Sequence, residues 1–102
     1  MNLSLLPALT PPIEKDNYTY ILRCCDGSLY CGWTCDLAHR LAVHNSGKGG
    51  KYTRSHLPAE LVWYTASSSK ENAMSLESKI KKLTRKQKLM LVCGECSLKE
   101  LF

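Results

Sequence analysis

Residues 18–33 read YTYILRCCDGSLYCGW. Two short runs rich in aromatic and β-favouring side chains lie here on either side of an Asp-Gly pair. Because Asp-Gly between two such runs is typical of a tight chain reversal, the stretch predicts a β-hairpin with strands over residues 18–24 and 28–33.

The register of this hairpin is left open by the sequence. A two-residue turn pairs Leu22 with Cys31 and places Tyr20 and Tyr30 on opposite faces. A three-residue loop with a left-handed Gly27 and a bulge instead pairs Leu22 with Tyr30. In that second register both tyrosines lie on one face as diagonal neighbours.

The rest of the chain predicts one more strand and three helices. Thr34 is a plausible N-cap of a helix that ends near Asn45. Residues 60–65 (ELVWYT) predict a third strand, and helices are predicted over 70–83 and 84–92. Thr84 is the expected cap of the second of these helices. This order predicts an α/β (α+β) fold, in which helices flank a small three-stranded antiparallel sheet.

A chain of 102 residues has room for one hydrophobic core. We expect a flexible N-terminal tail over 1–16, a single domain over 17–92 and a C-terminal tail over 93–102. No apolar run approaches the ~20 residues needed to cross a bilayer, so no membrane partner is expected.

The net charge of +5 is unevenly distributed, since residues 70–88 contain seven Lys or Arg and two Glu. Such a segment is typical of a phosphate-backbone binder or of a solvated helix face. The six cysteines do not form the paired spacings of a zinc site, although Cys93 and Cys96 have ligand-like spacing. We interpret them as free thiols in a reducing cytoplasm; a zinc-binding interaction protein is the rival hypothesis.

Glu77 is the polar residue that most needs an explanation. It lies within the apolar stripe of the helix predicted over 70–83, whose positions are Ala73, Leu76, Ile80 and Leu83. A carboxylate on such a stripe is costly unless it is paired or holds a metal. It could pair with Arg40, which lies beside His44 on the apolar side of the preceding helix, it could escape at the rim, or it could bind a metal.

Five positions together resemble the GIY-YIG nucleases. Residues 18–20 (YTY) stand at the first motif of that family and 29–32 (LYCG) at the second, with the first glycine and the isoleucine replaced by tyrosine and cysteine. Arg40, His44 and Glu77 stand at the family's arginine, a histidine found in several members, and the metal-binding glutamate.

The resemblance covers about residues 17–92 and is greatest to the short, stand-alone bacterial YhbQ-like branch. That branch is similar in residues 44–49 (HNSGKG), 51–54 (KYTR) and 83–88 (LTRKQK). Trp33 departs from the pattern, because some members have a lysine there.

The resemblance implies a phosphodiester hydrolase that uses Mg²⁺ (or Mn²⁺) bound by Glu77, a ligand type that magnesium accepts. It implies that Tyr20 orients and deprotonates the attacking water, with Tyr30 as positioning partner or alternative base. A free tyrosine has a pKa of about 10, so this role requires a lowered pKa. Arg40 would bind phosphate, and His44 would relay a proton or contact phosphate.

The implied function is an endonuclease that cuts DNA, with RNA not excluded, in DNA repair or recombination. So small a domain offers little surface for sequence readout, which indicates a dependence on DNA structure or on a protein partner. A catalytically silent nucleic-acid-binding module with the same fold is the alternative. The residues expected to contact nucleic acid are Lys48, Lys51, Tyr52, Arg54, Arg85, Lys86 and Lys88.

Overall fold

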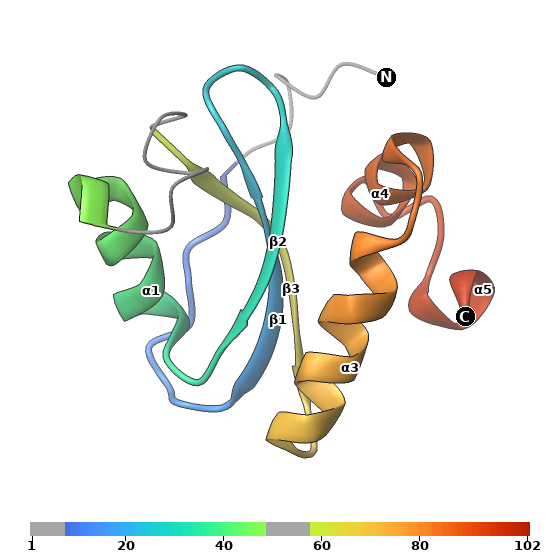
Figure 1. Ribbon diagram of the computed structural model, residues 1–102, viewed down its shortest axis with the longest axis horizontal. Coiled ribbons are helices and arrows are strands. Elements are labelled where there is room, and N and C mark those ends of the chain that lie inside the picture. The colour runs from blue at the N-terminus through green and yellow to red at the C-terminus, as the bar shows by residue number, and fades with distance from the viewer. Residues whose placement is uncertain (1–7, 49–57) are drawn as a thin grey trace.

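The computed structural model describes residues 8–48 and 58–102. Within them, β1 (Asn17–Arg23), β2 (Leu29–Thr34) and β3 (Glu60–Ser67) form one antiparallel sheet in the order β2-β1-β3. The central strand is therefore β1, and β2 and β3 lie at the edges (Figure 1). The predicted three-stranded antiparallel sheet with flanking helices is confirmed.

The hairpin adopts the second of the two predicted registers. Leu22 lies opposite Tyr30, and Tyr20 lies opposite Gly32. Gly27 has a φ of +84°, a left-handed conformation that glycine adopts without a Cβ clash. Side chains alternate between the faces of a strand, so this register places Tyr20 and Tyr30 on the same face.

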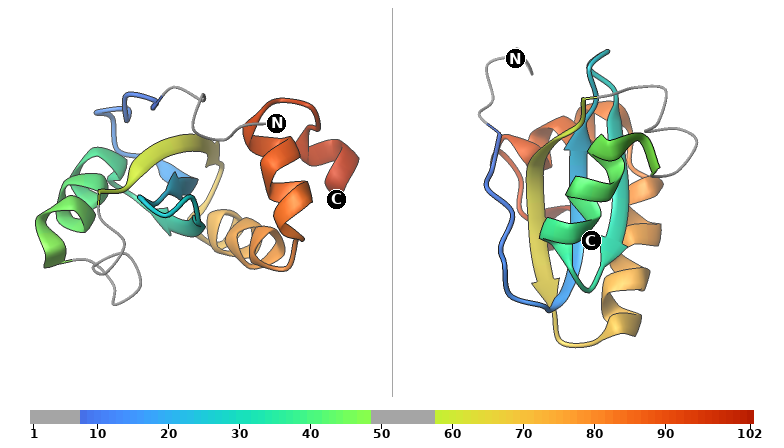
Figure 2. Two further views of the ribbon diagram at one scale, coloured as in Figure 1. Left: turned by 90° about the horizontal axis from the view of Figure 1, so that it is seen from above. Right: turned by 90° about the vertical axis from the view of Figure 1, so that its left-hand side faces the viewer.

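Each face of the sheet has its own hydrophobic cluster, and α1 and α3 lie on opposite faces (Figures 1 and 2). The cluster on the α1 face contains Tyr18, Tyr20, Leu22, Leu37, Ala59 and Leu61. The cluster on the α3 face contains Ile21, Cys31, Val62, Ile80 and Leu91. The sheet is thus buried on both faces, and β2 separates the two clusters at one edge.

Helix α1 (Leu37–Val43) begins later than the sequence predicts, and the expected cap at Thr34 is wrong. Thr34 is the last residue of β2, and its extended backbone belongs to the sheet. The cap is Asp36, whose carboxylate accepts a hydrogen bond of 3.2 Å from the backbone N–H of His39. The helix continues as the π-helical turn η2 (His44–Lys48).

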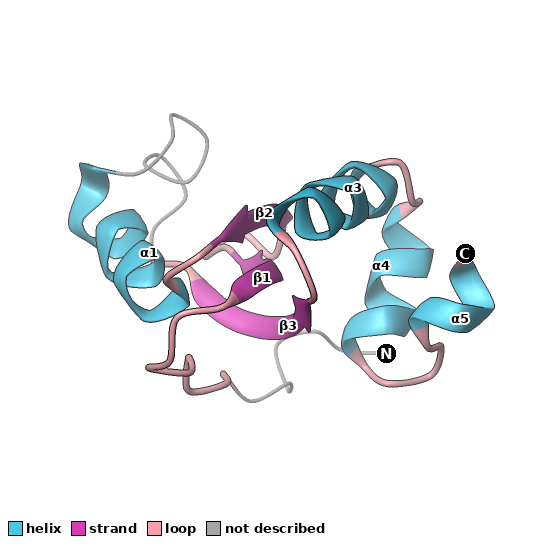
Figure 3. Ribbon diagram, turned by 90° about the horizontal axis from the view of Figure 1, so that it is seen from below, coloured by secondary structure: helices cyan, strands magenta, loops and turns pink. Residues whose placement is uncertain are grey.

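Two helices cover the other face of the sheet. Ser69 caps α3 (Lys70–Lys81), where its side chain accepts from the N–H of Asn72. Thr84 caps α4 (Arg85–Val92) in a reciprocal capping box with Gln87, which confirms the predicted cap. Figure 3 shows both helices on the side of the sheet away from α1.

The C-terminal residues form more structure than the predicted tail over 93–102. They include the short helix α5 (Leu98–Leu101), and Leu98 and Leu101 pack against the cluster on the α3 face. The sequence could not show this, because two leucines contribute to a core only when the chain folds back on it. At the other end, the described part of the predicted N-terminal tail meets the sheet, since the N–H of Leu9 donates to the Leu61 carbonyl at 2.8 Å. Residues 1–7 lie outside the described residues.

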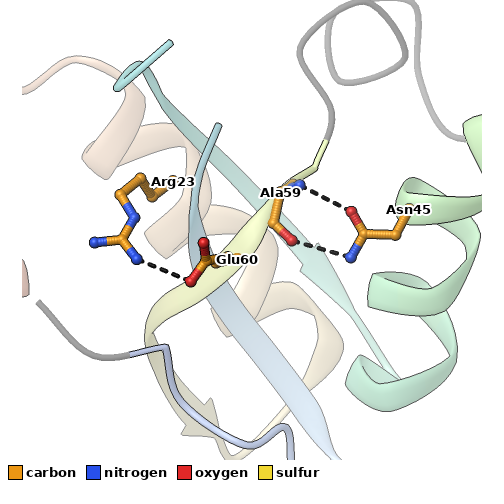
Figure 4. Close-up of polar contacts among 4 residues, drawn as sticks. All are labelled: Arg23, Asn45, Ala59 and Glu60. Atoms are coloured by element: carbon orange, nitrogen blue, oxygen red, sulfur yellow. Dashed lines mark hydrogen bonds and ion pairs between the residues drawn. The ribbon is translucent and has the colours of Figure 1, made fainter. Parts of the chain in front are cut away.

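One side-chain amide joins η2 to the start of β3. Asn45 donates to the backbone carbonyl of Ala59 at 3.0 Å and accepts from its N–H at 2.8 Å (Figure 4). Arg23 and Glu60 form an ion pair of 2.9 Å between β1 and β3 (Figure 4). The double hydrogen bond of Asn45 positions the residue before it, His44. Over residues 8–48 and 58–102, no helix is long and apolar enough to cross a membrane.

Candidate active site

The side chain of Tyr20 crosses the edge strand. Tyr20 is 2% exposed and lies opposite Gly32 of β2. A Cβ atom at Gly32 would have three atoms of the Tyr20 ring and hydroxyl as its nearest neighbours. The phenol therefore passes over β2, and the missing side chain of Gly32 makes the space for it.

The hydroxyl of Tyr20 meets His44. The hydroxyl oxygen lies 3.3 Å from Nε2 of His44, a residue buried at 2% exposure. The imidazole also packs edge-on against Tyr30, with 5.4 Å between ring centroids. Tyr20, Tyr30 and His44, predicted from separate motifs, form one contiguous group on the α1 face.

Burial acts on the two titratable groups of this pair in ways that favour their neutral forms. It raises the pKa of Tyr20 well above the ordinary value, and the nearby Tyr30 adds to the rise. It also lowers the pKa of His44, an effect that the charge of Arg40 increases. The expected lowering of the Tyr20 pKa is thus not provided by these residues, and a neutral imidazole is in place to accept the phenol proton.

Arg40 lies in the last turn of α1 and is exposed, so it is not the core-facing cation that the helix pattern predicts. Its charge nevertheless reaches the buried pair, because it lowers the pKa of both Tyr20 and His44. A guanidinium at this rim is accessible to a bound phosphate.

Glu77 comes to the site from the opposite face of the sheet. It lies on α3 with its side chain 22% exposed, and its carboxylate oxygen is 3.7 Å from Nζ of Lys81. Of the explanations considered above, a position at the rim agrees with this geometry. No ion pair between Glu77 and Arg40 occurs within the described residues.

The two halves of the candidate site meet at the open edge of β2. The negative charge of Glu77 raises the pKa of Cys31 on its own face and also that of Tyr20, whose ring lies on the other face. Helices α1 and α3 lie on opposite sides of the sheet (Figure 3). Tyr20, Tyr30, His44 and Arg40 belong to the α1 side of β2, and Glu77, a residue of α3, belongs to the other side.

The sequence did not single out Lys81 and Cys31, which also lie at this edge. Together with Leu29, Tyr30 and Lys88 they line a pocket of about 340 Å³. Burial, followed by the charge of Glu77, raises the pKa of the Cys31 thiol to about 12, which keeps it protonated and unreactive. The sequence could have indicated Lys81, because it follows Glu77 by four residues and residues at this spacing are neighbours on a helix.

The other predicted nucleic-acid contacts divide into two groups. Arg85 donates to the carbonyl of Gly27 at 3.1 Å and so joins α4 to the hairpin loop, whereas Lys86 is exposed on α4. Lys51, Tyr52 and Arg54 lie outside the described residues, as does the side chain of Lys48.

The residues at this edge fit a magnesium ion bound by one protein carboxylate. Glu77 is partly buried, and its contact with Lys81 is longer than a hydrogen bond. Magnesium keeps several waters and takes few protein ligands besides substrate phosphate oxygens. Over residues 8–48 and 58–102 there is no cluster of three or more His, Cys, Asp or Glu residues that could form a closed metal cage, and all six cysteines are free thiols.

Residues 16–90 match the model of the GIY-YIG catalytic domain. The chain therefore belongs to the GIY-YIG nuclease superfamily, which acts on nucleic acid. Its relatives include a UPF0213 protein of Streptococcus pneumoniae, 54% identical over 74% of this chain and 77% of the relative. A UPF0213 protein of Clostridium perfringens is 51% identical over 82% of this chain and 89% of the relative.

Two solution NMR structures are similar to this fold. One is a UPF0213 protein from Bacillus halodurans, with a TM-score of 0.51 and 46% identity, covering 83% of this chain and 90% of that one. The other is a protein from E. faecalis, with a TM-score of 0.55 and 40% identity, covering 79% and 86%. The predicted membership of the GIY-YIG family, in its branch of small, stand-alone YhbQ-like proteins, is confirmed.

Proposed function

We propose that this chain is an endonuclease that hydrolyses phosphodiester bonds in DNA with Mg²⁺ or Mn²⁺ bound at Glu77. The meeting of the Tyr20–His44 pair and Glu77 at the open edge of β2 supports this function most directly. An edge strand leaves that site open to a long polymer, which a closed cavity would exclude.

The chain's own residues supply the proton transfers of such a reaction. Tyr20 takes a proton from the attacking water as its own hydroxyl proton moves to Nε2 of His44, 3.3 Å away. The resulting hydroxide forms a bond to phosphorus. The bond from phosphorus to the leaving nucleoside oxygen breaks, and that oxygen keeps the electron pair and takes a proton from solvent. This relay never requires a free phenolate, so it agrees with the raised pKa of Tyr20.

Tyr30 is the alternative base, since its ring also packs against His44. Arg40 at the rim offsets the negative charge that grows on the phosphate in the transition state. A magnesium ion at Glu77, when bound, would polarise the phosphate and make the water more acidic.

We also propose that the enzyme acts in DNA repair or recombination, selects DNA by structure or through a protein partner, and works in the cytoplasm. Six free thiols agree with a reducing compartment. A surface of this size can contact backbone phosphates over a short length of duplex, which gives position without sequence information.

A panel of labelled substrates tests the function. Single-stranded, duplex, nicked, flapped and branched DNA, together with the matching RNA, are incubated with the protein in Mg²⁺, Mn²⁺ or EDTA. We expect metal-dependent internal cleavage of at least one DNA form. Binding of these substrates without any cleavage would instead support the catalytically silent binding module.

A further inference from the structure

The pocket between the β1–β2 hairpin and helices α3 and α4 contains two lysines, Lys81 and Lys88, that have no role in the chemistry described above. It has a volume of about 340 Å³ and adjoins the candidate site through Tyr30. Lys81 enters it from the end of α3, and Lys88 enters it from the middle of α4. The remaining lining residues are Leu29 and Cys31 of β2.

The lining of this pocket is positive. Among the residues that the structure describes, the ionic lining groups are the two ammonium groups and no carboxylate lines the pocket; the Glu77 carboxylate lies outside the lining, 3.7 Å from Lys81. Lys81 and Lys88 both act on the Cys31 thiol, where their charges oppose the rise in its pKa, so the two ammonium groups are close to the same pocket wall. Two cations that converge on a recess suit a small anion such as a phosphate group.

The position of the pocket along β2 relates it to the cleavage site. Tyr20 crosses β2 at Gly32, and the pocket begins at the next residues toward the hairpin, Cys31 and Tyr30. A strand advances by roughly 3.3 Å per residue. The pocket residues of β2 therefore lie roughly 3 to 10 Å along the edge from that crossing. A polymer that follows the open edge of β2 therefore passes from one to the other.

We propose that the pocket formed by Lys81 and Lys88 binds a backbone phosphate next to the phosphate that is cut. This inference rests on the proposed nuclease function, since it assumes that a nucleic-acid strand lies along β2 at Glu77. It assigns the substrate as a continuous strand with at least two phosphates. It adds Lys81 as a binding residue, and it gives Lys88, already expected to contact nucleic acid, a specific phosphate.

Salt dependence of binding tests the pocket without any cleavage. A short fluorescein-labelled oligothymidylate is titrated in EDTA at several salt concentrations with the parent protein, Lys81→Gln, Lys88→Gln and the double variant. Each lost phosphate contact lowers the slope of log affinity against log salt by roughly 0.7 for a single strand. Because the pocket binds one phosphate through both lysines, we expect the slope to fall in each single variant and by roughly 0.7 in the double variant.

Lys82→Gln is the matched control, because it removes the same charge from the neighbouring, exposed residue at the end of α3. It should keep the slope of the parent, and thermal unfolding of each variant shows that it is folded. In an NMR titration with inorganic phosphate, the backbone amides of Tyr30 and Cys31 should shift in the parent and not in the double variant.

Equal slopes for the parent and both pocket variants would overturn the inference, as would a phosphate response at Tyr30 and Cys31 that survives in the double variant. These outcomes are separate from failure of the proposed function. A protein that binds through Lys81 and Lys88 and never cuts would contradict the nuclease and retain the pocket. A protein that cuts DNA while both variants bind like the parent would support the nuclease and contradict the phosphate pocket.

Discussion

The Tyr20 ring lies over Gly32, so close that a Cβ atom at Gly32 would be 2.6 Å from the Tyr20 hydroxyl oxygen and 2.7 Å from its Cζ atom. The two residues are directly opposite in the β1–β2 ladder. Glycine at this position therefore allows the phenol to pass over β2 and reach His44 of η2.

Gly32→Ala should displace the Tyr20 ring, lower cleavage, and cost about 1–3 kcal/mol of unfolding free energy through overpacking. Denaturant unfolding measures the cost. The three nearest neighbours of the added Cβ all belong to Tyr20, so the same substitution in a Tyr20→Leu background should cost much less. An equal cost in both backgrounds would show that the Tyr20 contact is not the reason for glycine.

His44 should make the folded state less stable in mild acid. Its pKa is lowered below the ordinary 6.5, so the unfolded chain binds the proton more readily. Stability is therefore highest above the unfolded pKa and falls as the pH drops through it, until the pH passes the lower folded pKa. His44→Gln should remove this component from the pH dependence of the melting temperature between about pH 8 and about pH 5. Parallel curves for the parent and the variant would contradict it.

Lys81→Gln should have opposite effects on metal and on nucleic acid. The Lys81 ammonium lies 3.7 Å from the Glu77 carboxylate and repels a divalent cation there. We expect Mn²⁺ binding, measured by electron paramagnetic resonance without nucleic acid, to become several-fold tighter in Lys81→Gln and to remain unchanged in Lys82→Gln. Weaker Mn²⁺ binding in Lys81→Gln would place the metal elsewhere.

Thr84→Ala should destabilise the protein by about 1 kcal/mol, because the Thr84 hydroxyl and Gln87 form the capping box of α4. Ser97 is a useful control, since it occupies the N-cap position of α5 without a capping hydrogen bond from its side chain. Ser97→Ala should change the unfolding free energy only slightly. Equal losses in the two variants would mean that the hydrogen bonds of the capping box add nothing.

Local patterns were sufficient to predict most of the fold. Runs of aromatic, β-favouring and apolar residues predicted the three strands, and Thr84 predicted the start of α4. The choice of hairpin register needed the structure, because a two-residue and a three-residue loop both suit Asp26-Gly27. The cap of α1 was misplaced because Thr34 and Asp36 are both good caps, and only the sheet ladder shows that Thr34 is still part of β2.

The sequence proposed the residues of the candidate site but not their arrangement in space. Position along a helix showed that Glu77 lies near the apolar stripe, but not that α3 and α1 lie on opposite faces of the sheet. Burial of Tyr20 and the lysine pocket depend on contacts between segments far apart in the chain, which no local pattern contains. The expected contacts of residues 51–54 lie outside the described residues.

The central claim is that Glu77 provides the metal-binding carboxylate of a nuclease. Its most direct test compares Mg²⁺-dependent DNA cleavage by the parent, Glu77→Gln and the control Glu71→Gln, which removes an exposed carboxylate from the first turn of the same helix. We predict that Glu77→Gln stays folded and loses activity by on the order of a hundredfold or more, while Glu71→Gln cuts like the parent. Cleavage by a folded Glu77→Gln protein at the rate of the parent would contradict the account.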